Sequence, residues 1–418
     1  MEENNQVIIA GVSHLQTDFD YSMAELAQLV TANNLKVVDQ IRQHIDQINN
    51  KTYFGSGKVQ EIKQLAQYHN VSLIIVNDEL SPAQVRNLEK ATQLHFLDRT
   101  ELILQVFTQR AHSRQAQLQV AIAQLQYQLP RIHPSGNPLD QQRGQSGLAN
   151  RGAGESKLEL NRRTIRQQIT KLKQELRHVK QTLNTQGARR QNSKLPQVAL
   201  VGYTNAGKST TLNGILDLVA DKNSKKVFVK DQLFATLDTS IRKITLPQKP
   251  SFLLSDTVGF VSKLPHNLIE AFQSTLAEAK NADLLVQVID ASDSHREQMM
   301  QTTQQTLSEI GITNKPMIYA YNKADQTSDF QGPQVIGNNI YYSALQESSL
   351  KTLIELIYQK LFSNYRVIKV LIPYSNSQLN QSINQLVIQN QSYTNEGTIY
   401  QLLVSTTDYE SLTEYQID

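Results

Sequence analysis

The stretch from Gly202 to Thr210 reads GYTNAGKST and fits the pattern Gly-x-x-x-x-Gly-Lys-Ser, directly after the apolar run QVALV. Glycine at positions 202 and 207 allows the backbone to curl so that its N–H groups converge on phosphate oxygens. The ammonium of Lys208 would then reach the β- and γ-phosphates, and the hydroxyl of Ser209 would ligate Mg²⁺. The spacing therefore predicts a phosphate-binding loop between a strand and a helix.

A second motif, Asp-x-x-Gly, ends the run FLLSDTVGF from Phe252 to Phe260. Asp256 is expected to act on Mg²⁺ through a water, and the N–H of Gly259 is expected to face the γ-phosphate. Phe260 occupies the position where many GTP-hydrolysing proteins carry a water-orienting glutamine. A hydrolytic site of this kind must therefore obtain its catalytic group from elsewhere, and the sequence leaves that group unidentified.

The base-reading motif is NKAD, from Asn322 to Asp325, which follows the apolar strand MIYAY. The carboxylate of Asp325 can accept hydrogen bonds from guanine N1–H and the exocyclic amine together, whereas adenine lacks both donors. Asn322 would brace the phosphate loop, and the stem of Lys323 would lie along the ring. The segment SAL, from Ser343 to Leu345, would offer a backbone N–H to guanine O6. These residues predict selectivity for guanine.

The loop DQLFATLDTSIRK contains the threonine expected to ligate Mg²⁺ in the triphosphate state. We select Thr236, with Thr239 as the alternative. Ser209, Thr236 and Asp256 (the last through water) are then the predicted metal ligands. The predicted nucleotide-binding residues are Gly202, Tyr203, Thr204, Asn205, Ala206, Gly207, Lys208, Ser209, Thr210, Phe234, Ala235, Thr236, Leu237, Asp238, Asp256, Thr257, Val258, Gly259, Asn322, Lys323, Ala324, Asp325, Ser343, Ala344 and Leu345.

The composition of the chain narrows the function classes. Its 418 residues are 39% hydrophobic, enough to give several domains a core, and it contains no cysteine. The lack of cysteine excludes disulfides and thiol chemistry and argues against a redox enzyme. No run approaches a membrane span, and the acidic start MEENNQ lacks the order of a signal peptide. We therefore expect a cytoplasmic protein.

Positive charge is concentrated in one stretch. The net charge of the whole chain is +3, yet the stretch from Ser156 to Lys194 carries eleven lysines and arginines against two glutamates. Such an asymmetry indicates an element that binds a polyanion, because a helix that is only soluble would mix both signs. The alternative is a solvated helix face.

Four regions of the chain must position these motifs: three that combine strands with helices, and one helical region that follows the first of them. In residues 1–100, short apolar runs alternate with helix-like segments, which predicts a small parallel α/β domain. There the run FGSGKV lacks the first glycine and the final Ser or Thr of a phosphate loop, so it is interpreted as a turn that opens a helix. Residues 196–363 alternate six strands with helices, as in a Ras-like doubly wound nucleotide-binding domain. Residues 364–418 predict a small α+β domain.

Residues 101–195 predict an antiparallel helical hairpin. Between Glu101 and Leu129 the apolar spacing favours one long helix. A second helix carries a heptad seam of Leu158, Ile165, Ile169, Leu172, Leu176, Val179 and Leu183. The polar, Gly-containing loop QQRGQSGLANRGAGES lies between the two arms, and arginines gather near it. They are Arg131, Arg143, Arg151, Arg162, Arg163 and Arg166, of which the last five are the predicted RNA-binding residues.

These motifs together resemble one known family, the HflX GTPases of the translation-factor-like branch. GYTNAGKST, FATLD, DTVGF and NKAD are similar to its nucleotide motifs, and YFGSGKV, LDRTELILQVF and QLQVAIAQLQYQLPRI are similar to its N-terminal and helical signatures. The resemblance implies a GTPase that binds the large ribosomal subunit and its RNA and splits stalled ribosomes under stress. The loop departs from the family pattern, with GQSGLANRGAGE where GGIGTRGPGE is usual, which leaves room for a specialised paralogue.

The resemblance also bears on the catalytic group. An apolar residue at the position of Phe260 is usual in the family, and Asn205 matches a position that helps to hold K⁺ in related GTPases. Asn205 either holds such an ion or braces the loop. The chain is expected to act as a monomer with Mg²⁺. The alternative function is an RNA-binding assembly or anti-association factor in which GTP only locks a conformation, whereas a tRNA-modification GTPase would need a further domain motif that the sequence lacks.

Overall fold

The computed structural model describes residues 5–14, 18–132, 157–191, 195–219, 240–263, 277–376, 379, 382–384 and 386–417. The chain divides into two compact units. The first contains the described residues up to 188 together with 261–263, and the second contains the remainder. A mixed α/β fold with several sheets is thereby confirmed.

The first unit begins with a four-stranded parallel sheet in the order β2-β1-β3-β4. Val7 to Val12 on β1 are buried, as expected for a strand covered on both faces. The parallel α/β fold predicted for this region is confirmed. Its elements are β1 (Gln6–Ser13), α1 (Phe19–Ala32), β2 (Lys36–His44), α2 (Ser56–Tyr68), β3 (Leu73–Val76), α3 (Pro82–Thr92) and β4 (His95–Asp98). Gly55 caps the start of α2, so the FGSGK run opens a helix as predicted.

The single long helix expected from Glu101 to Leu129 is wrong, because two helices occupy this stretch. They are α4 (Arg99–Arg110) and α5 (Arg114–Gln128), followed by the short helix η1 (Leu129–Arg131). The backbone turns extended at Ala111, and the Ser113 hydroxyl accepts a hydrogen bond from the Ala116 N–H at 3.1 Å, which starts a new helix.

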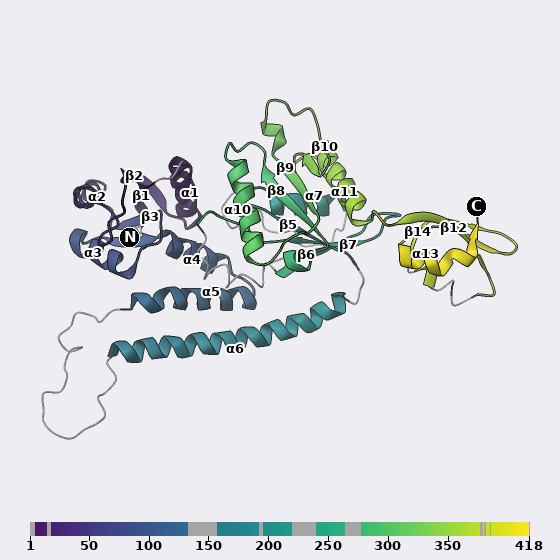
Figure 1. Ribbon diagram of the computed structural model, residues 1–418, viewed down its shortest axis with the longest axis horizontal. Coiled ribbons are helices and arrows are strands. Elements are labelled where there is room, and N and C mark those ends of the chain that lie inside the picture. The colour runs from purple at the N-terminus through teal and green to yellow at the C-terminus, as the bar shows by residue number, and fades with distance from the viewer. Residues whose placement is uncertain are drawn as a thin grey trace, which may run out of the picture. The chain divides into compact units, whose positions relative to one another are not determined.

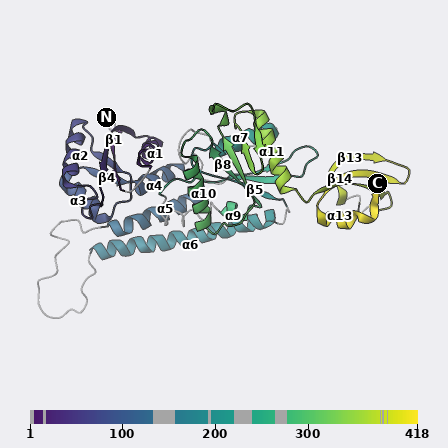
Figure 2. The same cartoon turned by 45° about the horizontal axis from the view of Figure 1, so that its top comes forward.

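Helix α6 (Lys157–Gln191) runs beside α5 in both views of the ribbon (Figures 1 and 2). Arg114 at the start of α5 pairs with Glu175, while Arg162 near the start of α6 lies 3.5 Å from the carbonyl oxygen of Ile132. These two contacts show that α5 and α6 run antiparallel. The described seam residues Ile165, Ile169, Leu172, Leu176 and Val179 are half-buried, while most of their neighbours on α6 are exposed.

The second unit contains a seven-stranded sheet in the order β10-β11-β9-β8-β5-β7-β6. Strands β5, β7, β8, β9 and β11 run parallel, and β6 and β10 are antiparallel edges. The strands are β5 (Gln197–Val201), β6 (Ser240–Ile244), β7 (Phe252–Asp256), β8 (Leu284–Asp290), β9 (Met317–Asn322), β10 (Gln334–Ile336) and β11 (Asn339–Tyr341). The helices are α7 (Lys208–Val219), α9 (Ala277–Asn281), α10 (Arg296–Glu309), η3 (Ala324–Gln326) and α11 (Glu347–Leu361). The sheet contains the six predicted strands and one further short edge, β10.

The C-terminal part of the second unit is an antiparallel sheet in the order β13-β14-β12-β15. Ile368, Val370, Leu402 and Val404 are buried on one face in a core shared with Leu412 of α13. The elements are β12 (Arg366–Pro373), β13 (Val387–Tyr393), β14 (Gly397–Val404), α13 (Thr406–Leu412), η4 (Thr413–Tyr415) and β15 (Gln416–Ile417). The α+β fold predicted here is confirmed.

Candidate nucleotide site

The loop between β5 and α7 requires glycine at two positions. Gly202 has φ +143°, and a Cβ there would lie 2.2 Å from the carbonyl oxygen of Val288. Gly207 has φ +95°, and a Cβ there would lie 2.1 Å from Nδ2 of Asn322. Both values fall in the region that side-chain-bearing residues rarely adopt. The loop can therefore hold its curve only with these glycines, as the phosphate-loop motif requires.

Lys208 at the first position of α7 is folded back over the loop. Its Nζ donates hydrogen bonds to the carbonyl oxygens of Gly202 at 3.0 Å and Tyr203 at 2.8 Å. Burial lowers the pKa of Lys208 to about 8, and the nearby carboxylate of Asp256 opposes that shift. A buried ammonium held by carbonyl oxygens is ready to stabilise an anion, because phosphate oxygens would satisfy the charge that the interior leaves poorly solvated.

The hydroxyl of Ser209 donates to Oδ2 of Asp256 at 2.6 Å, and the Asp256 side chain is buried. A hydroxyl and a carboxylate side by side are the hard oxygen donors that Mg²⁺ prefers, usually completed by water and phosphate. The two residues therefore fit a magnesium ion. In the described part of the chain, no cluster of three or more His, Cys, Asp or Glu side chains could hold a metal by itself.

The Asp-x-x-Gly segment lies along the phosphate loop. The Phe260 N–H donates to the Gly202 carbonyl at 3.1 Å, and the Thr204 N–H donates to the Phe260 carbonyl at 2.7 Å. A Cβ on Gly259 would lie 2.9 Å from Cα of Thr204 and 3.0 Å from Nζ of Lys208. The Phe260 side chain is 4% exposed. Its ring has no polar atom with which to orient a water, so this residue shapes the loop through its backbone.

The NKAD segment joins the phosphate loop to the following loop. Nδ2 of Asn322 donates to the Ala206 carbonyl at 2.9 Å, and its Oδ1 accepts from the Ala344 N–H at 2.9 Å. Tyr342 is buried, and its hydroxyl lies 2.7 Å from Oγ1 of Thr211 on α7. Asn322 thereby holds two loops in one arrangement at the carboxyl ends of the strands.

Two further side chains flank this segment. Nζ of Lys323 pairs with Asp290 at 2.7 Å, and the Lys323 backbone has φ +59°. Asp325 in η3 is exposed, so its carboxylate is accessible to a base. Neither Asp290 nor Tyr342 was singled out from the sequence. The position of Asp290 at the end of β8, at the sheet edge where the other motifs meet, could have indicated it.

The described nucleotide-binding candidates come together within the second unit. The phosphate loop, Asp256 to Phe260, the NKAD segment and Ser343 to Leu345 all follow the carboxyl ends of parallel strands or lead directly from them. Thr257 is buried, with Oγ1 donating to the Leu200 carbonyl at 2.7 Å. Phe234, Ala235, Thr236, Leu237, Asp238 and the alternative Thr239 lie outside the described residues.

The predicted RNA-binding arginines differ from one another. Arg143 and Arg151 lie outside the described residues, and Arg162 is half-buried. Arg163 and Arg166 are exposed, and we refer to these two as the basic face of α6.

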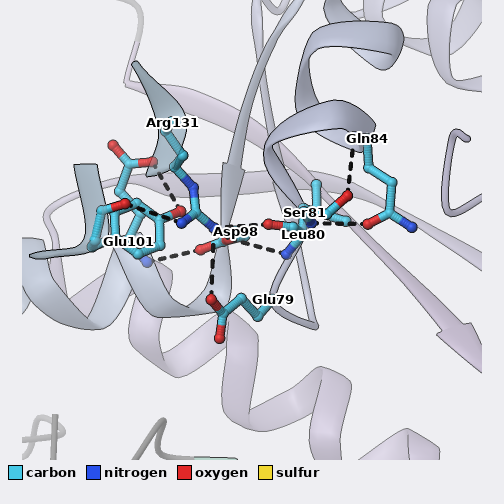
Figure 3. A network of polar contacts seen from close by, with 8 residues as sticks. Glu79, Leu80, Ser81, Gln84, Asp98, Glu101 and Arg131 are labelled. Atoms are coloured by element: carbon cyan, nitrogen blue, oxygen red, sulfur yellow. Dashed lines mark hydrogen bonds and ion pairs between the residues drawn. The ribbon is translucent and has the colours of Figure 1, made fainter. Parts of the chain in front are cut away.

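Arg131, one of the arginines that precede the Gly-containing loop, belongs to an internal polar network (Figure 3). Its guanidinium pairs with Asp98 at 3.0 Å, donates to the Leu80 carbonyl at 2.7 Å, and lies 3.5 Å from the centre of the Tyr127 ring. The Asp98 side chain is buried, and Arg131 is 17% exposed. Asp98 also caps α4 by accepting from the Glu101 N–H at 2.9 Å. Arg131 therefore fastens the end of η1 to the parallel sheet.

Comparison with known families agrees with this geometry. Three family models match in sequence: "GTP-binding GTPase N-terminal" at residues 20–108, "GTP-binding GTPase Middle Region" at 110–190, and "50S ribosome-binding GTPase" at 197–323. The GTPase HflX of Caldanaerobacter subterraneus is 39% identical over 90% of this chain and 85% of its own. This chain belongs to the HflX family of GTPases. It binds guanine nucleotide and hydrolyses GTP.

A second curated relative supports the same assignment. The GTPase HflX of Escherichia coli is 32% identical over 92% of this chain and 89% of its own. A solved GTP-binding protein from Sulfolobus solfataricus in complex with GDP is 25% identical, covering 86% of this chain and 99% of its own, with a TM-score of 0.44. Within the described ranges, no helix combines the length and apolar character needed to span a bilayer.

Proposed function

We propose that this GTPase binds the large ribosomal subunit and splits or rescues stalled ribosomes under stress. The observation that carries the proposal is the basic face of α6, which presents Arg163 and Arg166 to solvent on the helix that leads from the Gly-containing loop. Phosphate charge supplies most of the affinity of a basic surface for RNA. The match of the nucleotide domain to a model described as "50S ribosome-binding GTPase" supports a ribosomal target.

In this proposal the nucleotide is held by the residues predicted from the motifs. Lys208 binds the β- and γ-phosphates, and Asp325 selects guanine through its exposed carboxylate. Ser209 would ligate Mg²⁺ directly and Asp256 through a water, with Thr236 joining them in the triphosphate state. The ion supplies positive charge beside the transferred phosphoryl group.

In this proposal the catalytic site is complete only on the ribosome, because the side chain of Phe260 has no polar atom that could orient the attacking water. Docking would complete the site, and hydrolysis would rise by about 10²- to 10⁴-fold, within the range seen when a GTPase site is completed in trans. We place K⁺ beside Asn205, whose backbone has φ +61° and whose side chain is exposed. Equal hydrolysis rates in potassium and sodium would leave Asn205 with a bracing role only.

The proposed setting is the cytoplasm, with the protein acting as a monomer in association with ribosomes. The experiment that tests the function is sedimentation of 70S ribosomes with the protein and GTP, or with a non-hydrolysable analogue. The native chain should convert 70S particles to subunits and co-sediment with the large one. One round of separation with the analogue would assign hydrolysis to release.

The decisive variant reverses both charges of the basic face, with Arg163→Glu and Arg166→Glu. Ribosome binding and stimulation should be lost while nucleotide affinity stays unchanged, since the basic face belongs to the first unit and the nucleotide site to the second. Lys171→Glu with Lys173→Glu is the matched control, because these exposed residues lie on the same helix farther from the loop. If the arginine variant still sediments with the large subunit and is still stimulated, the docking proposal fails.

A second reading is an assembly or anti-association factor that uses GTP to lock one conformation. The buried Phe260 favours it, because slow intrinsic turnover suits a locking ligand. Ribosomes would then leave the hydrolysis rate unchanged while the GTP-bound protein still blocked the joining of subunits.

A further inference from the structure

The segment that follows the Asp-x-x-Gly motif leaves the nucleotide-binding unit. Residues 240–260 belong to the second unit, whereas Val261, Ser262 and Lys263 belong to the first. The backbone of Phe260 is bonded to the phosphate loop, as described above. Only one residue, Val261, separates that bonded position from Ser262. We call Asp256 to Phe260 the nucleotide-sensing segment. The contacts of Ser262 and Lys263 therefore connect the end of this segment to the first unit.

Ser262 is fastened to a buried ion pair. Its hydroxyl donates to the carboxylate of Glu25 and accepts from Arg99 at 3.0 Å, and the same guanidinium lies 3.3 Å from the Ser262 carbonyl oxygen. The side chains of Glu25 and Arg99 are 3% and 2% exposed. Glu25 comes from α1 and Arg99 from the start of α4, so the pair lies between two helices of the first unit.

The pair is also bonded to the rest of the first unit. Arg99 donates to Oδ1 of Asn77 at 2.9 Å, and Nδ2 of Asn77 donates to the Ser22 hydroxyl at 2.8 Å. A buried ion pair contributes little net stability, because the loss of hydration offsets the attraction between the charges. A buried pair that also bonds a segment from far along the chain is better explained by positioning than by stability.

Lys263 makes a second attachment one residue farther on. Its ammonium pairs with Asp78 in the loop after β3, and the same carboxylate accepts from the hydroxyl of Tyr53. The Lys263 backbone has φ +55°, which costs a side-chain-bearing residue about 1 kcal/mol or more. The ion pair with Asp78 offsets part of that cost and keeps the chain in this turn.

We propose that Ser262 and Lys263 are positioning residues for the nucleotide-sensing segment of this GTPase, held by Glu25, Arg99 and Asp78 of the first unit. Gly259, which is expected to contact the γ-phosphate, lies three residues before Ser262. A change in the position of Gly259 between the diphosphate and triphosphate states must therefore strain or relax the two attachments. The first unit then senses which nucleotide is bound, and by linkage it biases that choice.

The test is hydrogen exchange of the full chain, without ribosomes, bound to GDP or to a non-hydrolysable GTP analogue. In the native protein, amides of α1 and of the loop around Asp78 should exchange at rates that differ at least about threefold between the two nucleotides. In the double variant Ser262→Ala/Lys263→Met that difference should vanish. The ratio of the two nucleotide dissociation constants should also change by about threefold or more.

Two further variants separate positioning from general damage. Lys263→Arg keeps the charge opposite Asp78 and should retain the native difference. Lys249→Met removes an ion pair with Glu355 at similar lysine exposure, 32% against 30%, within the second unit, and should leave both readouts unchanged. The proposal is overturned if the native protein shows no nucleotide-dependent exchange in α1, or if the double variant keeps it. Because ribosomes are absent, neither outcome depends on the proposed ribosomal function.

Discussion

The nucleotide site and the basic face of α6 differ in how far their positive charges are exposed to solvent. Lys208 is buried and bonded to two carbonyl oxygens, within a loop whose course depends on two glycines. Arg163 and Arg166 are exposed on a helix surface. The first arrangement suits a small ligand bound in one pose, because the course of the loop is set by its two glycines. The second suits a large polyanion, for which charge density matters more than the position of any one side chain.

The largest effect is expected from a substitution that disrupts the geometry of the phosphate loop and leaves every charge in place. In Gly207→Ala the new methyl group would overlap Asn322 at a φ of +95°, so the loop must shift. GDP binding should weaken by about 10³-fold, measured by titration calorimetry. Gly57→Ala is the control, since a Cβ at Gly57 would contact nothing within 4 Å. Near-native affinity in the Gly207 variant would contradict a loop whose course depends on glycine at this position.

The next effect should come from the base-reading carboxylate. Asp325→Asn replaces an acceptor for two guanine donors, so GTP affinity should fall about 100-fold while xanthosine triphosphate, whose C2 oxygen accepts from the new amide, should bind better than to the native chain. Competition with a fluorescent nucleotide measures both. Asp329→Asn, another exposed carboxylate a few residues on, should change neither affinity. Unchanged GTP affinity in the Asp325 variant removes the assignment.

Substitutions on the basic face should weaken binding less than a substitution in the phosphate loop. Arg163→Ala with Arg166→Ala should weaken binding to ribosomal RNA by about 10- to 50-fold at moderate salt. The slope of log affinity against log salt should fall by about one for each arginine removed. Filter binding over a salt series checks this, with the Lys171→Ala/Lys173→Ala pair for comparison. A salt slope equal to that of the native chain would show that these arginines do not contact phosphate.

The smallest effect is a dependence of nucleotide affinity on pH. Burial lowers the pKa of Lys208 to about 8, so the ammonium that binds phosphate is lost from the free protein as pH rises above that value. Affinity for GDP should be flat below about pH 7 and fall by about tenfold in total as the pH rises to about 9. Lys208→Arg, whose charge does not titrate in this range, should bind with no such decline. A parallel decline in both proteins would assign the titration to another group.

The sequence predicted the phosphate loop better than it predicted the helices and polar contacts of the first unit. The phosphate loop was predictable because its requirements are local: positive φ at Gly202 and Gly207 is encoded by residue type within six positions. The break between α4 and α5 was missed, since it contains neither Gly nor Pro and depends on the Ser113 cap. The role of Arg131 was missed because its partner, Asp98, is 33 residues away. Contacts over such distances leave no periodic trace in the sequence.

The attachment of Ser262 to Arg99 has a consequence during synthesis of the chain. The two residues are 163 positions apart, and ribosomes add roughly 5 to 20 residues per second, so roughly 8 to 33 s pass between them. For that interval the nascent first unit contains Glu25 and Arg99 without the serine that later bonds both. The bonds from Ser262 to this ion pair thus form only after translation has passed the Asp-x-x-Gly motif. The buried pair of Glu25 and Arg99 therefore gains its last bonded partner only when the segment that follows the nucleotide site has been made.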